Sequence, residues 1–181
     1  MPGTSLRVIV FTSLLISSAT AHATTANDIC SAASNPCTLS SGRTVTPGSL
    51  LDFGSRQLVL TGSGRLEIST GSFRILAGGL TMNPGARIIA TRSASVEVNV
   101  TGNILLESTG STRSPIITTD PVPGDVTLTA GGNVTLNGYI WANSNHDDGD
   151  GGDVLISSVG AMVQTDSISV AGGYNAGGGT I

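Results

Sequence analysis

The chain of 181 residues carries 11% charged residues, a formal net charge of −4, 25 glycines and no lysine. This charge balance offers no basic patch that could neutralise phosphates, which argues against nucleic acid as a partner. Valine, isoleucine, leucine, threonine and serine dominate between the glycines, and this composition favours short strands joined by tight turns. We therefore predict an all-β protein.

The first segment has the layout of a secretory signal peptide. Arg7 is its only charge, residues 8–16 are apolar, and Ala21-His22-Ala23 follows as a small-x-small cleavage site. The apolar stretch is shorter than the roughly 20 residues of a membrane-spanning helix. We expect residues 1–23 to be removed, the mature chain to lack a transmembrane segment, and the protein to be secreted or on the cell surface.

Cys30 and Cys37 are the only cysteines, and they lie in a stretch rich in serine, asparagine and proline. An oxidising compartment favours a disulfide between them, although two independent thiols are the alternative. Closing so short a loop stabilises a protein by about 2 kcal/mol. We predict that residues 24–37 form an N-terminal cap segment held by this disulfide.

An internal repeat is the strongest signal in the sequence. Gly124-Asp125-Val126 recurs 28 residues later as Gly152-Asp153-Val154. At the same offset, six apolar or glycine positions coincide: Val126, Leu128, Gly132, Val134, Ile140 and Ala142 with Val154, Ile156, Gly160, Met162, Ile168 and Val170. Toward the N-terminus, Val96 and Val98 precede Val126 and Leu128 by 30 residues, and Leu66 and Ile68 precede Val96 and Val98 by the same offset.

Between these positions the chain alternates apolar and polar residues, which is the period of strands with one buried face. A repeat of this kind cannot bury its apolar face alone, so successive copies must stack. We predict a right-handed parallel β-helix over residues 38–181, with a β-sandwich as the structural alternative. Because 177–181 has the composition of the start of another coil, we expect the chain to be truncated at its C-terminus.

Three segments resemble exported bacterial β-helix surface proteins: 47–60, 75–90, and 124–138 with its sequence GDVTLTAGGNVTLNG. The last of these is similar to the repeats of filamentous-haemagglutinin-type adhesins. The resemblance implies a β-helix fold and an extracellular location.

Glu67 and Glu97 are candidate residues for a carbohydrate-active lyase or hydrolase, because such enzymes on a β-helix use carboxylates beside a basic group. Their offset of 30 predicts that they stack on neighbouring coils and face outward, where together they could hold a cation. The alternative is two exposed strand glutamates, since neither has a basic partner at a matched position.

The segment 143–153 is the most acidic part of the chain and contains Asp147, Asp148, Asp150 and Asp153. Oxygen-rich loops bind calcium, so these four residues are candidate ligands for calcium, which is the only cofactor that the sequence suggests. The segment departs from known calcium repeats, and the alternative is a flexible corner in which aspartates cap turns. His146 lies in the same loop, where a catalytic base would not be held rigidly.

Tyr139 and Trp141 are two residues apart on one predicted strand and therefore project to the same face. Their neighbours Ile140 and Ala142 occupy repeated apolar positions, which places Trp141 outside. An exposed aromatic pair can stack on a sugar ring or anchor a protein interface. We predict a ligand site here for a carbohydrate or for a host or matrix protein, with an aromatic that merely leans across a loop as the alternative.

The sequence thus predicts a non-enzymatic β-helix adhesin or structural stalk, with no catalytic residues. A polysaccharide lyase or hydrolase on the same fold is the alternative function.

Overall fold

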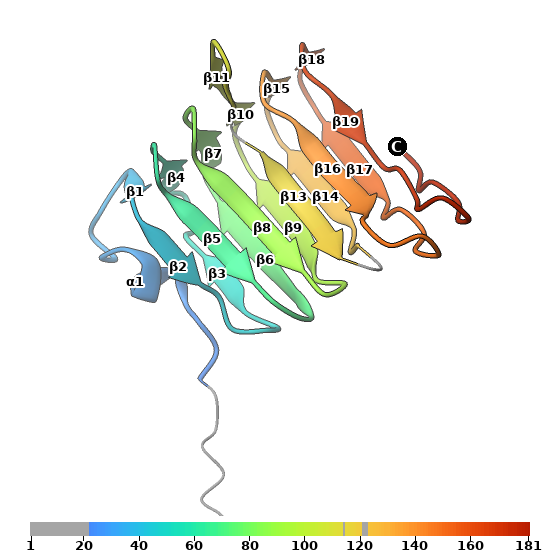
Figure 1. The fold of residues 1–181 in the computed structure, drawn as a ribbon. Coiled ribbons are helices and arrows are strands. Elements are labelled where there is room, and N and C mark those ends of the chain that lie inside the picture. The colour runs from blue at the N-terminus through green and yellow to red at the C-terminus, as the bar shows by residue number, and fades with distance from the viewer. Residues whose placement is uncertain (1–21, 114, 121–122) are drawn as a thin grey trace, which may run out of the picture.

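The computed structural model describes residues 22–113, 115–120 and 123–181. The strands wind around one axis into a parallel β-helix of about 5 turns (Figure 1). We call one passage through the three sheets a coil. The predicted parallel β-helix is confirmed, and the alternative β-sandwich is wrong, because the strands of all three large sheets pair in parallel with the preceding and following coil.

Three sheets, A, B and C, run along the axis. Sheet A contains β1 (Cys37–Leu39), β4 (Gln57–Leu60), β7 (Gly79–Met82), β10 (Ile104–Leu106), β15 (Val134–Leu136) and β18 (Met162–Gln164). Sheet B contains β2 (Gly42–Thr44), β5 (Arg65–Ile68), β8 (Arg87–Thr91), β13 (Ile116–Asp120), β16 (Ile140–Ser144) and β19 (Ile168–Ser169). Sheet C contains β3 (Leu50–Asp52), β6 (Ser72–Ala77), β9 (Ser95–Val100), β14 (Val126–Ala130) and β17 (Val154–Ser158). In the fourth coil an antiparallel hairpin of β11 (Ser108–Thr109) and β12 (Thr112–Arg113) separates sheet A from sheet B.

The core is a set of columns of inward-facing aliphatic side chains. In sheet B the column Leu66, Ile88, Ile116 and Ile140 is completely buried, and each residue pairs with the next coil. The residues between them face outward, because side chains alternate across a strand. The hydrophobic alternation of the sequence therefore divides each strand into a core side and an outer side.

The repeat predicted for the second half of the chain is confirmed. Val126 pairs with Val154 in one direction and with Val96 in the other. The two offsets recur in hydrogen bonds between coils, with 28 residues from Asp125 to Asp153 and 30 residues from Ser95 to Asp125.

The extension of this repeat to the first half is wrong. Leu66 belongs to sheet B and pairs with Ile88, whereas Val96 belongs to sheet C and pairs with Phe73. The coils are shorter here, with an offset of 23 residues between the paired residues Arg74 and Glu97. All three strands of a coil show the same alternation, so the pattern alone does not distinguish a strand of one sheet from a strand of another.

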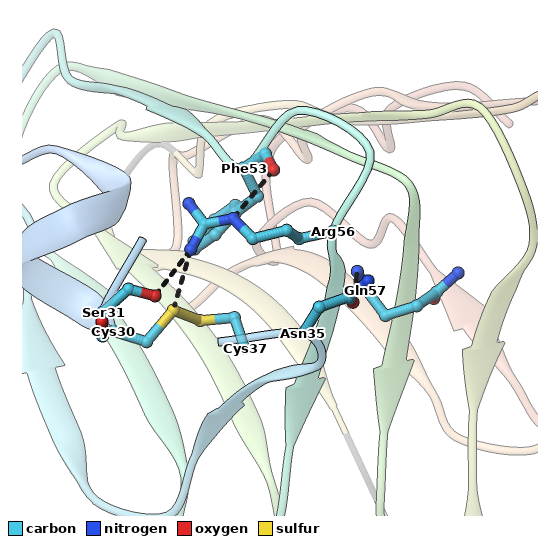
Figure 2. The surroundings of a disulfide bond; sticks show 7 residues. All are labelled: Cys30, Ser31, Asn35, Cys37, Phe53, Arg56 and Gln57. Carbon is cyan, nitrogen blue, oxygen red and sulfur yellow. Dashed lines mark hydrogen bonds between the residues drawn. A yellow bond between two sulfur atoms is a disulfide. The ribbon is translucent and has the colours of Figure 1, made fainter. Parts of the chain in front are cut away.

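The N-terminal end of the solenoid carries a short helix, α1 (Ala26–Ile29), whose Ala26 and Ile29 are buried (Figure 1). The predicted disulfide between Cys30 and Cys37 is confirmed, with the two Cα atoms 5.8 Å apart. Figure 2 shows how Arg56 holds this segment: its guanidinium group donates to the Ser31 carbonyl oxygen at 2.9 Å and lies 5.5 Å from the centre of the Phe53 ring.

Most of the predicted signal peptide, residues 1–21, lies outside the described residues, and its removal stays a prediction. Across the part of the chain that the structure describes, no helix has the length and apolar character needed to cross a membrane.

Candidate functional site

Tyr139 and Trp141 lie together on the outer face of sheet B. Ile140 and Ala142 are fully buried on either side of Trp141, so the indole ring projects outward and is 41% exposed. The two ring centres are 4.5 Å apart and the ring planes are inclined at 40°. This arrangement presents a compact aromatic surface to solvent, and its role in ligand binding stays a prediction.

The aromatic pair continues an apolar row that the sequence analysis missed. Ile89, Ile117 and Trp141 are in register on three consecutive coils, and the two isoleucines are half-buried on the outer face. We call Ile89, Ile117, Tyr139 and Trp141 the apolar strip. A signal was present in the doublets Ile88-Ile89 and Ile116-Ile117, because adjacent residues of a strand cannot both face the core.

The outer face of sheet B becomes charged toward the N-terminus. Arg65 and Arg87 pair on neighbouring coils, and Glu67 pairs with Ile89 at the end of the apolar strip. Arg65 forms an ion pair with Glu67, with 2.9 Å between Nε and Oε1. Arg87 is exposed and forms no ion pair with any residue that the structure describes.

Glu97 does not stack on Glu67, which corrects the prediction of a glutamate pair. Glu97 lies in sheet C and Glu67 in sheet B, because the offset of 30 does not apply to the first coils. The expectation that neither glutamate has a basic partner is also wrong, since Glu67 pairs with Arg65 and Glu97 with Arg74 at 2.7 Å. The register of the short coils places Arg74 directly beside Glu97.

A shallow groove runs along the outside of sheet C past this second ion pair, and its lining includes Arg74, Ser95, Glu97 and Asp125. Partial desolvation raises the pKa of Glu97, but the hydrogen bonds from Arg74 and Asn99 outweigh it and hold the pKa below its usual range. Glu97 is therefore a carboxylate at neutral pH, with both oxygens engaged.

The aspartates of the acidic segment bond to the following coil. The Oδ1 atom of Asp150 accepts from the Gly177 amide at 2.9 Å, and that of Asp153 accepts from the Thr180 amide and hydroxyl at 2.8 Å. These bonds hold the pKa of Asp153 below its usual range. Asp148 contacts the Asn175 side-chain amide at 3.3 Å. The segment thus stacks on residues 171–180, as a corner capped by aspartates does.

No group of three or more His, Cys, Asp and Glu side chains within the described ranges is arranged to hold a metal ion. Asp147, Asp148, Asp150 and Asp153 are not brought together as a ligand set in this arrangement, and calcium binding stays a prediction. His146 is exposed at the loop tip, where its Nδ1 atom accepts from the Asp148 amide at 3.5 Å.

Comparison of the chain with protein-family models, with curated proteins and with solved structures finds no match.

Proposed function

We propose that this protein is a secreted or cell-surface β-helix without catalytic activity, and that it acts as an adhesin whose contact surface is the apolar strip of sheet B. The observation that carries the proposal is the half-exposed indole of Trp141, stacked near Tyr139 at the end of a row of outward isoleucines. Exposed contiguous apolar surface is characteristic of binding sites, and aromatic side chains dominate binding energies.

The extracellular location is supported by two features. The first 23 residues have the layout of a signal peptide, and the Cys30–Cys37 disulfide is the kind of bond that persists in oxidising compartments. Expression in a bacterial host with a C-terminal tag tests this directly. We expect the protein outside the cytoplasm with Thr24 as its first residue, and an intact N-terminus inside the cell would contradict the location.

Binding is tested with immobilised polysaccharides and extracellular-matrix proteins. Trp141→Ala is expected to weaken binding at least tenfold, which corresponds to about 1.4 kcal/mol. Leu155→Ala is the matched control, because Leu155 is 62% exposed on sheet C of the same coil. If both variants lose binding equally, the strip is not the contact surface; if the wild type binds none of these probes, a structural stalk replaces the adhesin.

A carbohydrate-active lyase or hydrolase is the second candidate, favoured by the groove of sheet C. There Arg74 and Glu97 stand on neighbouring coils beside Asp125, so a basic group and carboxylates line one elongated depression. Turnover of acidic polysaccharides, assayed with and without calcium, that vanishes in Glu97→Gln and persists in Trp141→Ala would support this function over the first.

A further inference from the structure

We infer that the ligand of the apolar strip is an acidic glycan, whose sugar ring stacks on Trp141 and Tyr139 and whose carboxylate or sulfate group binds Arg87. The inference rests on the proposed function and adds the chemical class of the ligand.

The register of sheet B places the positively charged Arg87 in line with the aromatic pair. The Ile88 amide bonds to the Pro115 carbonyl oxygen and the Ile116 amide bonds to the Tyr139 carbonyl oxygen, so Arg87, Pro115 and Tyr139 follow one another along the axis. Strands are about 4.8 Å apart, which puts Arg87 and Tyr139 about 10 Å apart along this line. Ile89 and Ile117 lie beside it in the next outward row.

Of the described residues between the two ends, Pro115 is buried, and Ile117 in the next outward row is apolar and half-buried. A short oligosaccharide lying along the solenoid axis would cover Ile117 while one of its rings contacts Trp141. Its flat apolar sugar face suits an aromatic surface, and hydroxyl groups at its rim stay in water.

Charge on this face favours an anion at Arg87. Of the charged side chains that the structure places on the outer rows of sheet B, Arg65 and Glu67 neutralise each other in their ion pair, and Arg87 remains. The chain as a whole has a net charge of −4, so general attraction does not bring polyanions to it. A guanidinium group can donate two parallel hydrogen bonds to a carboxylate or sulfate, which makes Arg87 a specific contact.

The test compares matched pairs of immobilised oligosaccharides: oligogalacturonate against its methyl ester, and a heparin oligosaccharide against its desulfated, N-acetylated form. We expect the wild type to prefer the acidic member of a pair, and Arg87→Gln to lose roughly threefold to tenfold of its affinity for that member while binding the neutral one unchanged. Arg43→Gln, at an exposed arginine of β2 in the first coil, is the control and should leave the preference intact.

A third variant changes affinity in the opposite direction. Glu67→Gln releases Arg65 from its ion pair and removes the one acidic side chain described on this face, so affinity for the acidic probe should rise about threefold. If Glu67 has only a structural role, Glu67→Gln should give no gain in affinity for the acidic probe.

The outcomes separate the two proposals. Binding that depends on Trp141 but is equal for both members of each pair, or is unchanged in Arg87→Gln, overturns the acidic ligand and leaves the adhesin standing. The absence of Trp141-dependent binding to every probe overturns both. Thermal unfolding of each variant checks that folding is unchanged.

Discussion

The first and second halves of the solenoid turn their corners by different means. From β1 to β9 the coils are short, and corner residues such as Gly62, Gly71 and Gly85 have positive φ, as do Arg92 and Ser93. After Gly110, no residue in the described part of the chain has positive φ, and the coils lengthen to offsets of 28 and 30 residues. The later corners, coloured orange to red in Figure 1, extend further from the sheets.

In the longer coils, side chains of asparagine and aspartate accept hydrogen bonds from backbone amides of the following coil. Asn103 accepts a hydrogen bond from the Asn133 amide, and Asn133 accepts one from the Ala161 amide. Asp125 and Asp153 form a second series of the same kind, which ends on the Thr180 amide. In both series the acceptor belongs to the earlier coil, so each coil orders the same corner of the next one.

The balance of interactions therefore differs between the two halves. Several short corners contain residues with left-handed backbone, and the core beneath them is closed. A longer corner depends on its neighbours, and the inward residues of the last coil, such as Ile168 and Val170, are only partly buried. We expect core substitutions to dominate in the first half and hydrogen bonds between coils to matter most in the second.

The largest difference in stability between the two halves should come from substitutions of two isoleucines in one core column. Ile88 is completely buried in the third coil, whereas Ile168 is half-buried in the last. Ile88→Ala should cost about 2–5 kcal/mol of unfolding free energy because it leaves a cavity, and Ile168→Ala about 1 kcal/mol or less. Urea unfolding measures both, and equal losses would refute the contrast between the halves.

Reduction of the Cys30–Cys37 disulfide is expected to lower stability by about 2 kcal/mol, since it frees a short loop of the unfolded chain. The loss should appear in the first half, where the segment around the disulfide contacts Arg56. Hydrogen exchange with and without reductant locates it. Faster exchange confined to the amides of β17 to β19 would contradict this assignment.

These two regions also differ in how far the sequence predicts them. The pairing of Val126 with Val154 follows from a direct repeat, and the disulfide follows from the presence of only two cysteines. The sequence does not predict the register of the short coils, because corner length depends on residues with left-handed backbone, such as Arg92 and Ser93, that composition does not mark.

The candidate site also has one part that the sequence predicts and another that it does not. The outward position of Trp141 follows from alternation along one strand, which is local information. The ion pair of Arg74 with Glu97 joins residues that lie side by side only in the correct register. A prediction that assigns Glu97 to the wrong sheet therefore misses this ion pair.

Asn133→Ala should cost about 1 kcal/mol, because it leaves the Ala161 amide without its acceptor. Asn137→Ala is the matched control, because the Asn137 side-chain oxygen accepts from the Thr165 hydroxyl group and not from a backbone amide of a described residue. This variant should cost less than about 0.5 kcal/mol. Urea unfolding and exchange of the Ala161 amide measure the effect. Equal losses in the two variants would mean that the series of side-chain acceptors does not stabilise the longer coils.

The smallest effect should be a pH dependence at Asp153. Its carboxylate accepts from the Thr180 amide and hydroxyl, which hold its pKa below the usual range, so the contribution of these bonds is complete above about pH 4 and is lost as the pH falls through the lowered pKa. Protection of the Thr180 amide from exchange should therefore decrease in acid. Asp153→Asn retains an oxygen acceptor without a charge, and should remove this decrease while weakening protection slightly at neutral pH.

Thr180→Val separates the two donors at Asp153, because it deletes the hydroxyl group and keeps the amide. The pKa of Asp153 should then rise part of the way toward its ordinary value, as followed by NMR titration of the carboxyl carbon. If the titration of Asp153 is the same in Thr180→Val and the wild type, the hydroxyl bond does not persist in solution, and the side chain of Asp153 is held by the Thr180 amide alone.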